Sequence, residues 1–111
     1  MMSPALDMRK GSTTVLILTL LSEQPMYGYQ LVKELERRSA GYFNLKEGTL
    51  YPALHRLEKD GLVYGEWEKM DQGPARKYYH LTDKGRQALV KSAEEWGTFA
   101  RKLLTVLDNV C

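Results

Sequence analysis

A polar and cationic face on one short helix is the part of this sequence with the clearest chemistry. Within residues 46–60, Leu50, Leu54 and Leu57 recur at steps of four and three. At about 100° per residue they form one stripe, which we expect to face a core. The remaining positions carry flat, hydrogen-bonding and cationic side chains that suit contacts to bases and phosphates in a DNA major groove, namely Lys46, Thr49, Tyr51, Pro52, His55, Arg56 and Lys59. The sequence does not decide which of them contact bases.

A basic β-hairpin is expected directly after this helix. The run from 62 to 67 is rich in apolar and aromatic residues that favour a strand, and a Gly-Pro pair at 73–74 marks a turn. A second strand should follow over residues 76–81. Arg76 and Lys77 at its start would then contact the DNA backbone beside the helix.

Two helices are expected before this segment. Residues 12–22 are apolar around most of the helical circumference, so their helix should be the hub of the core, with Ser12 as its N-cap. Residues 27–38 show apolar positions at helical spacing and should form the first helix of a helix-turn-helix pair. Residues 42–45 are expected to form a short strand that pairs with the hairpin.

A long last helix should run from about Asp83 to Asn109, capped by Thr82. At about 1.5 Å per residue it would be about 40 Å long, more than a small head needs. Its apolar residues step by four and three along a heptad seam, namely Leu89, Ala93, Trp96, Ala100, Leu103, Leu107 and Val110. Such a seam favours a homodimer with twofold symmetry, although packing within one chain could use part of it.

Length and composition indicate one compact unit. The chain has 111 residues, of which 43% are hydrophobic, and divides into a head over residues 1–81 and a dimerisation helix over residues 82–111. The net charge is only +2, so we expect few and local phosphate contacts. The sequence lacks a long apolar run and a secretory signal, and its single cysteine, Cys111, agrees with a reducing compartment, so we expect a cytoplasmic protein without membrane contact.

The residues that could support catalysis or bind a metal are sparse. His55 and His80 are the only histidines, and with one terminal cysteine they form no cluster at metal-ligand spacing. The sequence contains no Gly-rich phosphate loop and no nucleophile elbow. We therefore expect no enzyme activity, no metal and no cofactor.

Three runs in this sequence resemble a known family. The segments PMYGYQLVKEL, EGTLYPALHRLEKDGL and RKYYHLTDKG are similar to those of the PadR family of transcriptional regulators, and the resemblance spans about residues 8 to 108. It implies a mainly α chain with a small β-hairpin (α+β), folded as a winged helix-turn-helix with a long C-terminal dimerisation helix. It also implies a bacterial dimer that binds double-stranded DNA.

The single C-terminal helix resembles the multidrug-responsive branch of this family, in which paired tryptophans stack flat aromatic compounds. That resemblance implies a ligand site formed by Trp96 from both chains, with Met8, Ser12, Val15, Leu89, Ala93, Phe99 and Ala100 around it. The position of Trp96 within the seam is also explained by dimer packing alone. Residue 100 is an alanine and supplies no acidic group for a cationic drug, so a neutral or phenolic ligand, or none, stays open.

Together these features predict a homodimeric repressor that binds a palindromic operator and is released by a small aromatic or phenolic ligand. Two alternatives stay open. One is a ligand-binding module with a Trp-lined dimer pore and weak DNA binding. The other is a winged-helix adaptor that uses its exposed tyrosines on a protein partner.

Overall fold

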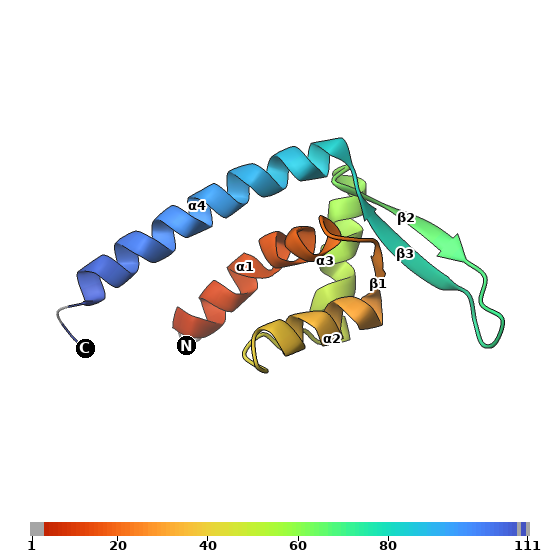
Figure 1. Cartoon of the computed structure of the whole chain (residues 1–111), viewed down its shortest axis with the longest axis horizontal. Helices are drawn as coiled ribbons and strands as arrows, with labels where there is room; N and C mark the ends of the chain where they lie inside the picture. The colour runs from red at the N-terminus through yellow and green to blue at the C-terminus, as the bar shows by residue number, and fades with distance from the viewer. Residues whose placement is uncertain (1–3, 109, 111) are drawn as a thin grey trace.

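The computed structural model describes residues 4–108 and 110, with only the backbone for residues 4–7, 9 and 10. In chain order the elements are α1 (Pro4–Leu21), β1 (Met26–Tyr27), α2 (Gly28–Arg38), α3 (Glu47–Lys59), β2 (Val63–Glu68), β3 (Arg76–Leu81) and α4 (Asp83–Leu107). The first three helices form a head, the hairpin β2–β3 projects from it as a wing, and α4 runs back alongside α1 (Figure 1). This is a mainly helical winged helix-turn-helix, as predicted.

The core lies between α1, α2 and α3. Ile17 and Leu18 of α1 are almost fully buried, and they meet Leu31 of α2 in one apolar cluster. The predicted stripe on α3 is confirmed, because Leu50, Leu54 and Leu57 are all buried, together with Ala53. Fully burying a leucine contributes about 1.5–3 kcal/mol, so this stripe is what fixes α3 against α1 and α2.

The first helix begins earlier than the sequence suggested. It starts at Pro4, so Ser12 lies in its middle and is buried, and the prediction of Ser12 as N-cap was wrong. Proline is favoured at the first position of a helix, because an N–H group there would have no acceptor within the helix and its absence costs nothing. At the other end of the chain, the predicted helix end at Asn109 and the thiol of Cys111 lie outside the described residues.

The third strand of the sheet is not the predicted one. β1 pairs antiparallel with β3 through Met26↔Tyr79 and Tyr27↔Tyr78, and β3 lies between β1 and β2. Residues 42–45 instead belong to the loop between α2 and α3. The hydroxyl of Ser39 accepts a hydrogen bond from the Phe43 amide over 2.8 Å, and Phe43 packs against the core cluster. These contacts hold the loop against α2 and away from the hairpin.

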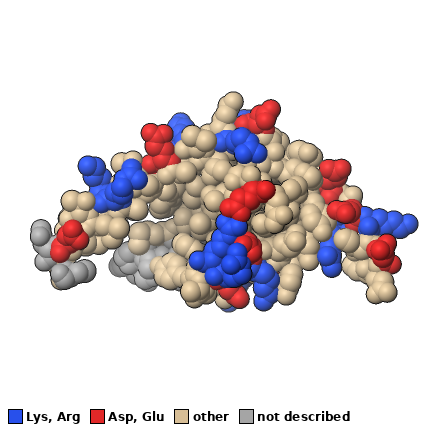
Figure 2. All heavy atoms as spheres, in the orientation of Figure 1, with Lys and Arg blue, Asp and Glu red and all other residues tan. Residues whose placement is uncertain are grey.

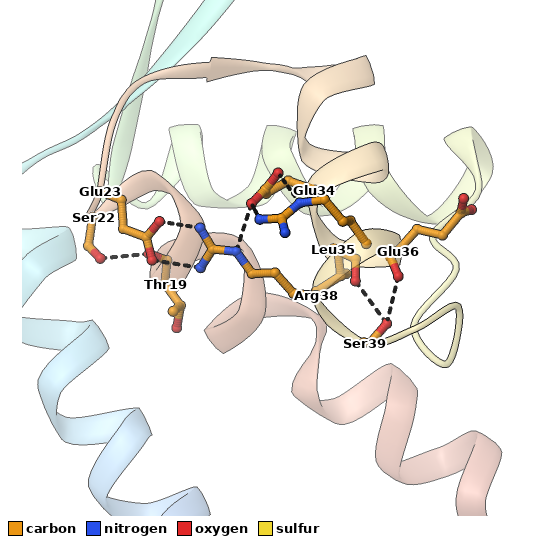
Figure 3. Close-up of polar contacts among 9 residues, drawn as sticks. Thr19, Ser22, Glu23, Glu34, Leu35, Glu36, Arg38 and Ser39 are labelled. Carbon is orange, nitrogen blue, oxygen red and sulfur yellow. Dashed lines mark hydrogen bonds and ion pairs between the residues drawn. The ribbon is translucent and has the colours of Figure 1, made fainter.

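An ion-pair cluster ties α2 to the turn that follows α1 (Figure 3). Arg38 binds Glu23 in that turn and also donates from Nε to Glu34 over 2.8 Å. Hydrogen bonds from Arg37 and Arg38 lower the pKa of Glu34 to about 2. The cluster is exposed, so solvent screens it and its role is to orient α2 more than to add stability.

A tight corner joins α3, β2 and α4. Thr82 caps α4 as predicted, because its hydroxyl oxygen accepts from the Gly85 amide over 2.9 Å, and the same hydroxyl lies 2.7 Å from the carbonyl of Gly61. A Cβ on Gly85 would lie 2.0 Å from the carbonyl oxygen of Leu62. Lys84 donates to the Asp60 carbonyl over 2.9 Å. The end of α3 and the start of α4 therefore form one junction.

Candidate nucleic-acid interface

The polar face of α3 is open to solvent. Seven of the nine residues that the sequence assigned to DNA contact lie on or next to α3, and all seven are exposed, namely Lys46, Thr49, Tyr51, Pro52, His55, Arg56 and Lys59. The buried leucine stripe lies opposite Tyr51, His55 and Lys59, so one helical period produces both faces. Arg56 and Lys59 stand in the last turn of α3, where cations also interact favourably with the helix dipole.

Tyr51 lies over the start of α2. A Cβ at Gly28 would be 2.4 Å from the Tyr51 hydroxyl oxygen and 2.9 Å from the ring carbon that bears it. Only glycine leaves room for the ring in this position. The Tyr51 hydroxyl group therefore lies near the N-terminus of α2. Because Tyr51 is 46% exposed, a ligand can still reach it.

Arg76 and Lys77 face opposite sides of the wing, because successive side chains of a strand alternate. Arg76 is exposed, and its guanidinium carbon lies 4.5 Å from the ring centroid of Tyr27 on β1. Tyr27 in turn makes an edge contact with Tyr78. This arrangement places Arg76 at the surface of the sheet, where it can meet a phosphate.

Lys77 is less exposed than Arg76, the residue before it on β3. It is half-buried, and its ammonium group donates to Oε1 of Glu58 on α3 over 3.1 Å. Glu58 is not among the residues predicted from the sequence to contact DNA. Its only sequence signal is a position near the end of α3, and nothing there indicates a partner 19 residues away.

A hollow of about 440 Å³ separates the wing from α2 and α3. Tyr27, Tyr51 and Arg76 line it, together with the indole of Trp67, which is 68% exposed. From the sequence, Trp67 was predicted only to favour a strand. In the structure it is a large flat side chain at the same opening as the predicted contact residues Tyr51 and Arg76.

Positive and negative side chains are mixed on one face of the molecule. Figure 2 shows Lys and Arg side chains interspersed with Asp and Glu on the face in view. This agrees with a net charge of only +2. With so small a net charge, DNA recognition would depend on a few placed groups.

The long helix α4 carries a second candidate site. Within one chain, Leu89, Trp96 and Leu103 of the predicted seam are half-buried, whereas Ala93, Ala100, Leu107 and Val110 are exposed. Four further apolar side chains are exposed outside the seam, namely Val90, Phe99, Leu104 and Val106. At about 100° per residue they widen the apolar surface on both sides of the seam.

Trp96 packs against α1 through Gly11, since a Cβ there would lie 3.6 Å from the indole ring. Its ring meets Phe99 edge to face, with centroids 5.9 Å apart. A shallow hollow of about 340 Å³ is lined by these two rings and by Glu95. Glu95 was not predicted from the sequence to lie at this site. Only residue 100 was considered there as the place for an acidic group, and it is an alanine.

The other predicted ligand neighbours do not line this hollow. Ser12 and Val15 are buried in α1, Met8 is 39% exposed, and Ala93 and Ala100 face solvent. Among the described residues, no group of three His, Cys, Asp or Glu side chains could hold a metal. No helix in that part of the chain is long and apolar enough to cross a bilayer.

A helix-turn-helix followed by a β-hairpin wing defines the class of winged-helix DNA-binding proteins. The model of the "Transcriptional regulator PadR-like family" matches residues 17–91, which include α2, α3 and the wing. The chain therefore belongs to this family of transcriptional regulators.

Similar proteins agree with this assignment. The "Transcriptional regulator Rv3488" of Mycobacterium tuberculosis is 35% identical over 88% of this chain and 88% of its own length. A solved PadR-like transcriptional regulator from Bacillus cereus is 36% identical, with a TM-score of 0.79, over 91% of this chain and 96% of that chain. A transcriptional regulator from Clostridium thermocellum is 30% identical, with a TM-score of 0.81, over 89% and 96%.

Proposed function

We propose that this regulator is a cytoplasmic homodimeric repressor that binds a palindromic site on double-stranded DNA. In this proposal α3 enters the major groove, and Arg76 of the wing contacts the flanking backbone. The observation that carries the proposal is the exposed polar face of α3, held beside Arg76 by one compact head. Contacts from Arg56 and His55 would read bases, while Thr49, Tyr51 and Lys59 would contact phosphates.

The dimer is formed through α4 in this proposal. A helix with an apolar surface wider than one seam stabilises a fold only when more than one neighbour covers it. Helix α1 covers one side within the chain, and a second copy would cover Leu107, Val110 and the adjacent exposed residues. Two heads about 34 Å apart would reach half-sites separated by one turn of DNA.

Release from DNA follows from a ligand bound beside Trp96. A planar aromatic compound would stack on the Trp96 ring in the hollow that Phe99 and Glu95 complete. Because Trp96 also contacts α1 and lies on the dimerisation helix, a ligand there would favour one separation of the two heads over another. The carboxylate of Glu95 would favour a ligand with positive charge over a phenolate.

A gel-shift titration with the DNA upstream of the protein's own gene tests the proposal. Arg56→Ala and Arg76→Ala should each weaken binding by about 1–3 kcal/mol, which is roughly 5- to 150-fold. Loss of a phosphate contact should also lower the slope of log affinity against log salt by about one. Lys91→Ala, on α4, is the matched control and should leave affinity unchanged.

Normal binding by both arginine variants would contradict the proposed interface. The titration also separates the two alternatives. Aromatic ligand binding without salt-dependent DNA affinity would favour a ligand-binding module, which the hollow at Trp96 supports. Binding to a protein partner but to no duplex would favour an adaptor.

A further inference from the structure

The ion pair between Glu58 and Lys77 connects the wing to the recognition helix. The Lys77 ammonium group donates to Glu58 Oε1 over 3.1 Å, and the two side chains keep only 29% and 33% of their surface exposed. The pair spans elements that are 19 residues apart in the chain. It is therefore a tertiary contact that bears on the angle between β3 and α3.

The path of the Lys77 side chain is confined. A Cβ on Gly65 of β2 would lie 2.1 Å from Lys77 Cε and 3.2 Å from Glu58 Oε2, so the pair crosses directly over this glycine. The ammonium group also stands 5.3 Å from the ring centroid of Tyr79, beside Lys77 on β3. A carboxylate, a glycine and an aromatic ring together hold Lys77 in one direction, toward α3.

We infer that Glu58 and Lys77 form a positioning pair that sets the wing at the angle where Arg76 and α3 contact the same duplex. The inference rests on the DNA binding proposed above. An ammonium group already held by a carboxylate contributes little to phosphate binding, because the phosphate would have to displace or share that partner. None of the ion pairs among the described residues involves Arg76, so its charge is available to DNA.

Two roles for Lys77 predict opposite effects of Glu58→Gln. If Lys77 contacts phosphate, removal of the carboxylate frees the cation and takes away a negative charge, so DNA binding tightens. If the pair sets the wing angle, the same change loosens the wing and weakens binding.

The experiment compares Glu58→Gln, Lys77→Met, the double variant and the charge swap Glu58→Lys/Lys77→Glu. Affinity for a labelled duplex from upstream of the protein's own gene is measured across a range of salt concentrations. Amide hydrogen exchange of β2 and β3 is measured without DNA. Each single variant should bind about two- to fivefold more weakly with faster wing exchange, as expected for a partly exposed pair. The double variant should be no weaker than either single variant, the salt slope should not change, and the swap should restore affinity.

Glu68→Gln removes one negative charge, as Glu58→Gln does, but from the hairpin that carries Lys77. It leaves the pair in place, so it should not weaken binding. Tighter binding by Glu58→Gln would overturn the inference, as would a salt slope lowered by about one in Lys77→Met. If the wild-type chain binds no duplex, the proposed DNA binding fails by itself. Hydrogen exchange still tests the pair in that case, because unchanged wing exchange in both single variants would overturn it.

Discussion

At the scale of single residues, the contact between Gly28 and Tyr51 links the two helices of the helix-turn-helix pair. An alanine at position 28 would place its Cβ 2.4 Å from the Tyr51 hydroxyl oxygen, so the ring must rotate away. Gly28→Ala should change the free energy of unfolding by less than about 1 kcal/mol, because the ring that must move is partly exposed. It should weaken DNA binding several-fold, because the Tyr51 hydroxyl leaves its position.

Thermal unfolding and DNA titration of the same variant separate these effects. Tyr51→Phe keeps the ring and removes the hydroxyl group, so it serves as the comparison and should show the same loss of affinity. Wild-type affinity in Gly28→Ala would mean that the position of Tyr51 does not matter for DNA.

Residues differ in how far the sequence alone could place them. The exposure of Arg56 and the burial of Leu54 were predicted, because one helical period determines both faces of α3. The pairing of Lys77 with Glu58 was not predicted, because it depends on the angle at which the wing packs against α3. Local patterns contain no information about that angle, so cross-element partners had to come from the structure.

At the scale of elements, long helices and strands could also be predicted from local patterns, whereas pairing between elements could not. The helices α2, α3 and α4 were predicted from periodicity, because each is long enough to show a pattern. The hairpin was predicted from its strand-favouring residues and the Gly-Pro turn between them. β1 has only two residues, Met26–Tyr27, which is too short for alternation to be seen. It forms because the turn after α1 brings it beside β3, where Met26 can be buried next to Tyr79.

The corner between α3 and α4 leaves no room for a side chain at Gly85. At Gly85, a Cβ would lie 2.0 Å from a backbone oxygen, that of Leu62, and 2.8 Å from a methyl group of Leu81. Backbone atoms cannot rotate aside, so Gly85→Ala should destabilise the fold by about 2–3 kcal/mol, within the usual cost of overpacking. Chemical denaturation followed by circular dichroism measures this cost.

Gly48→Ala is the matched control, because nothing lies within 4 Å of its added methyl group. That change should stabilise α3 by about 0.5 kcal/mol, since alanine reduces the freedom of the unfolded chain. Equal stabilities for the two variants would show that the corner can relax, and that the start of α4 is not fixed to the end of α3.

At the scale of the whole molecule, the long α4 gives the chain extents of 56 × 27 × 25 Å. Helix α1 contacts α4 within the chain, and several apolar residues near the end of the chain are exposed, with Leu104 63%, Val106 72% and Val110 79% exposed. Exposed apolar surface of this kind marks an interaction site. The proposed dimer would cover these exposed apolar side chains, which the head leaves open to solvent.

The hollow beside Trp96 on this long helix is predicted to bind a planar cationic compound. In a Trp67→Phe background, Trp96 is the only tryptophan, and a planar cationic dye should quench its fluorescence in a saturable way. Glu95→Gln should weaken binding of that dye about two- to fivefold, the loss expected for one exposed charge pair. A neutral dye of similar size is the control and should bind both forms equally. Absence of saturable quenching would count against a ligand site at this place.

The dimer itself is tested at Leu107, a seam residue that is 41% exposed in the single chain. Leu107→Glu would place a charge in the proposed interface, so light scattering should show a monomer. Affinity for a palindromic duplex should then fall by about a hundredfold or more, because the second head no longer binds as part of the same particle. Thr105→Glu adds the same charge on the polar side of α4 and should leave both the dimer and the affinity intact. If Leu107→Glu stays dimeric with full affinity, the seam is not the interface, and the two heads must be joined through another surface.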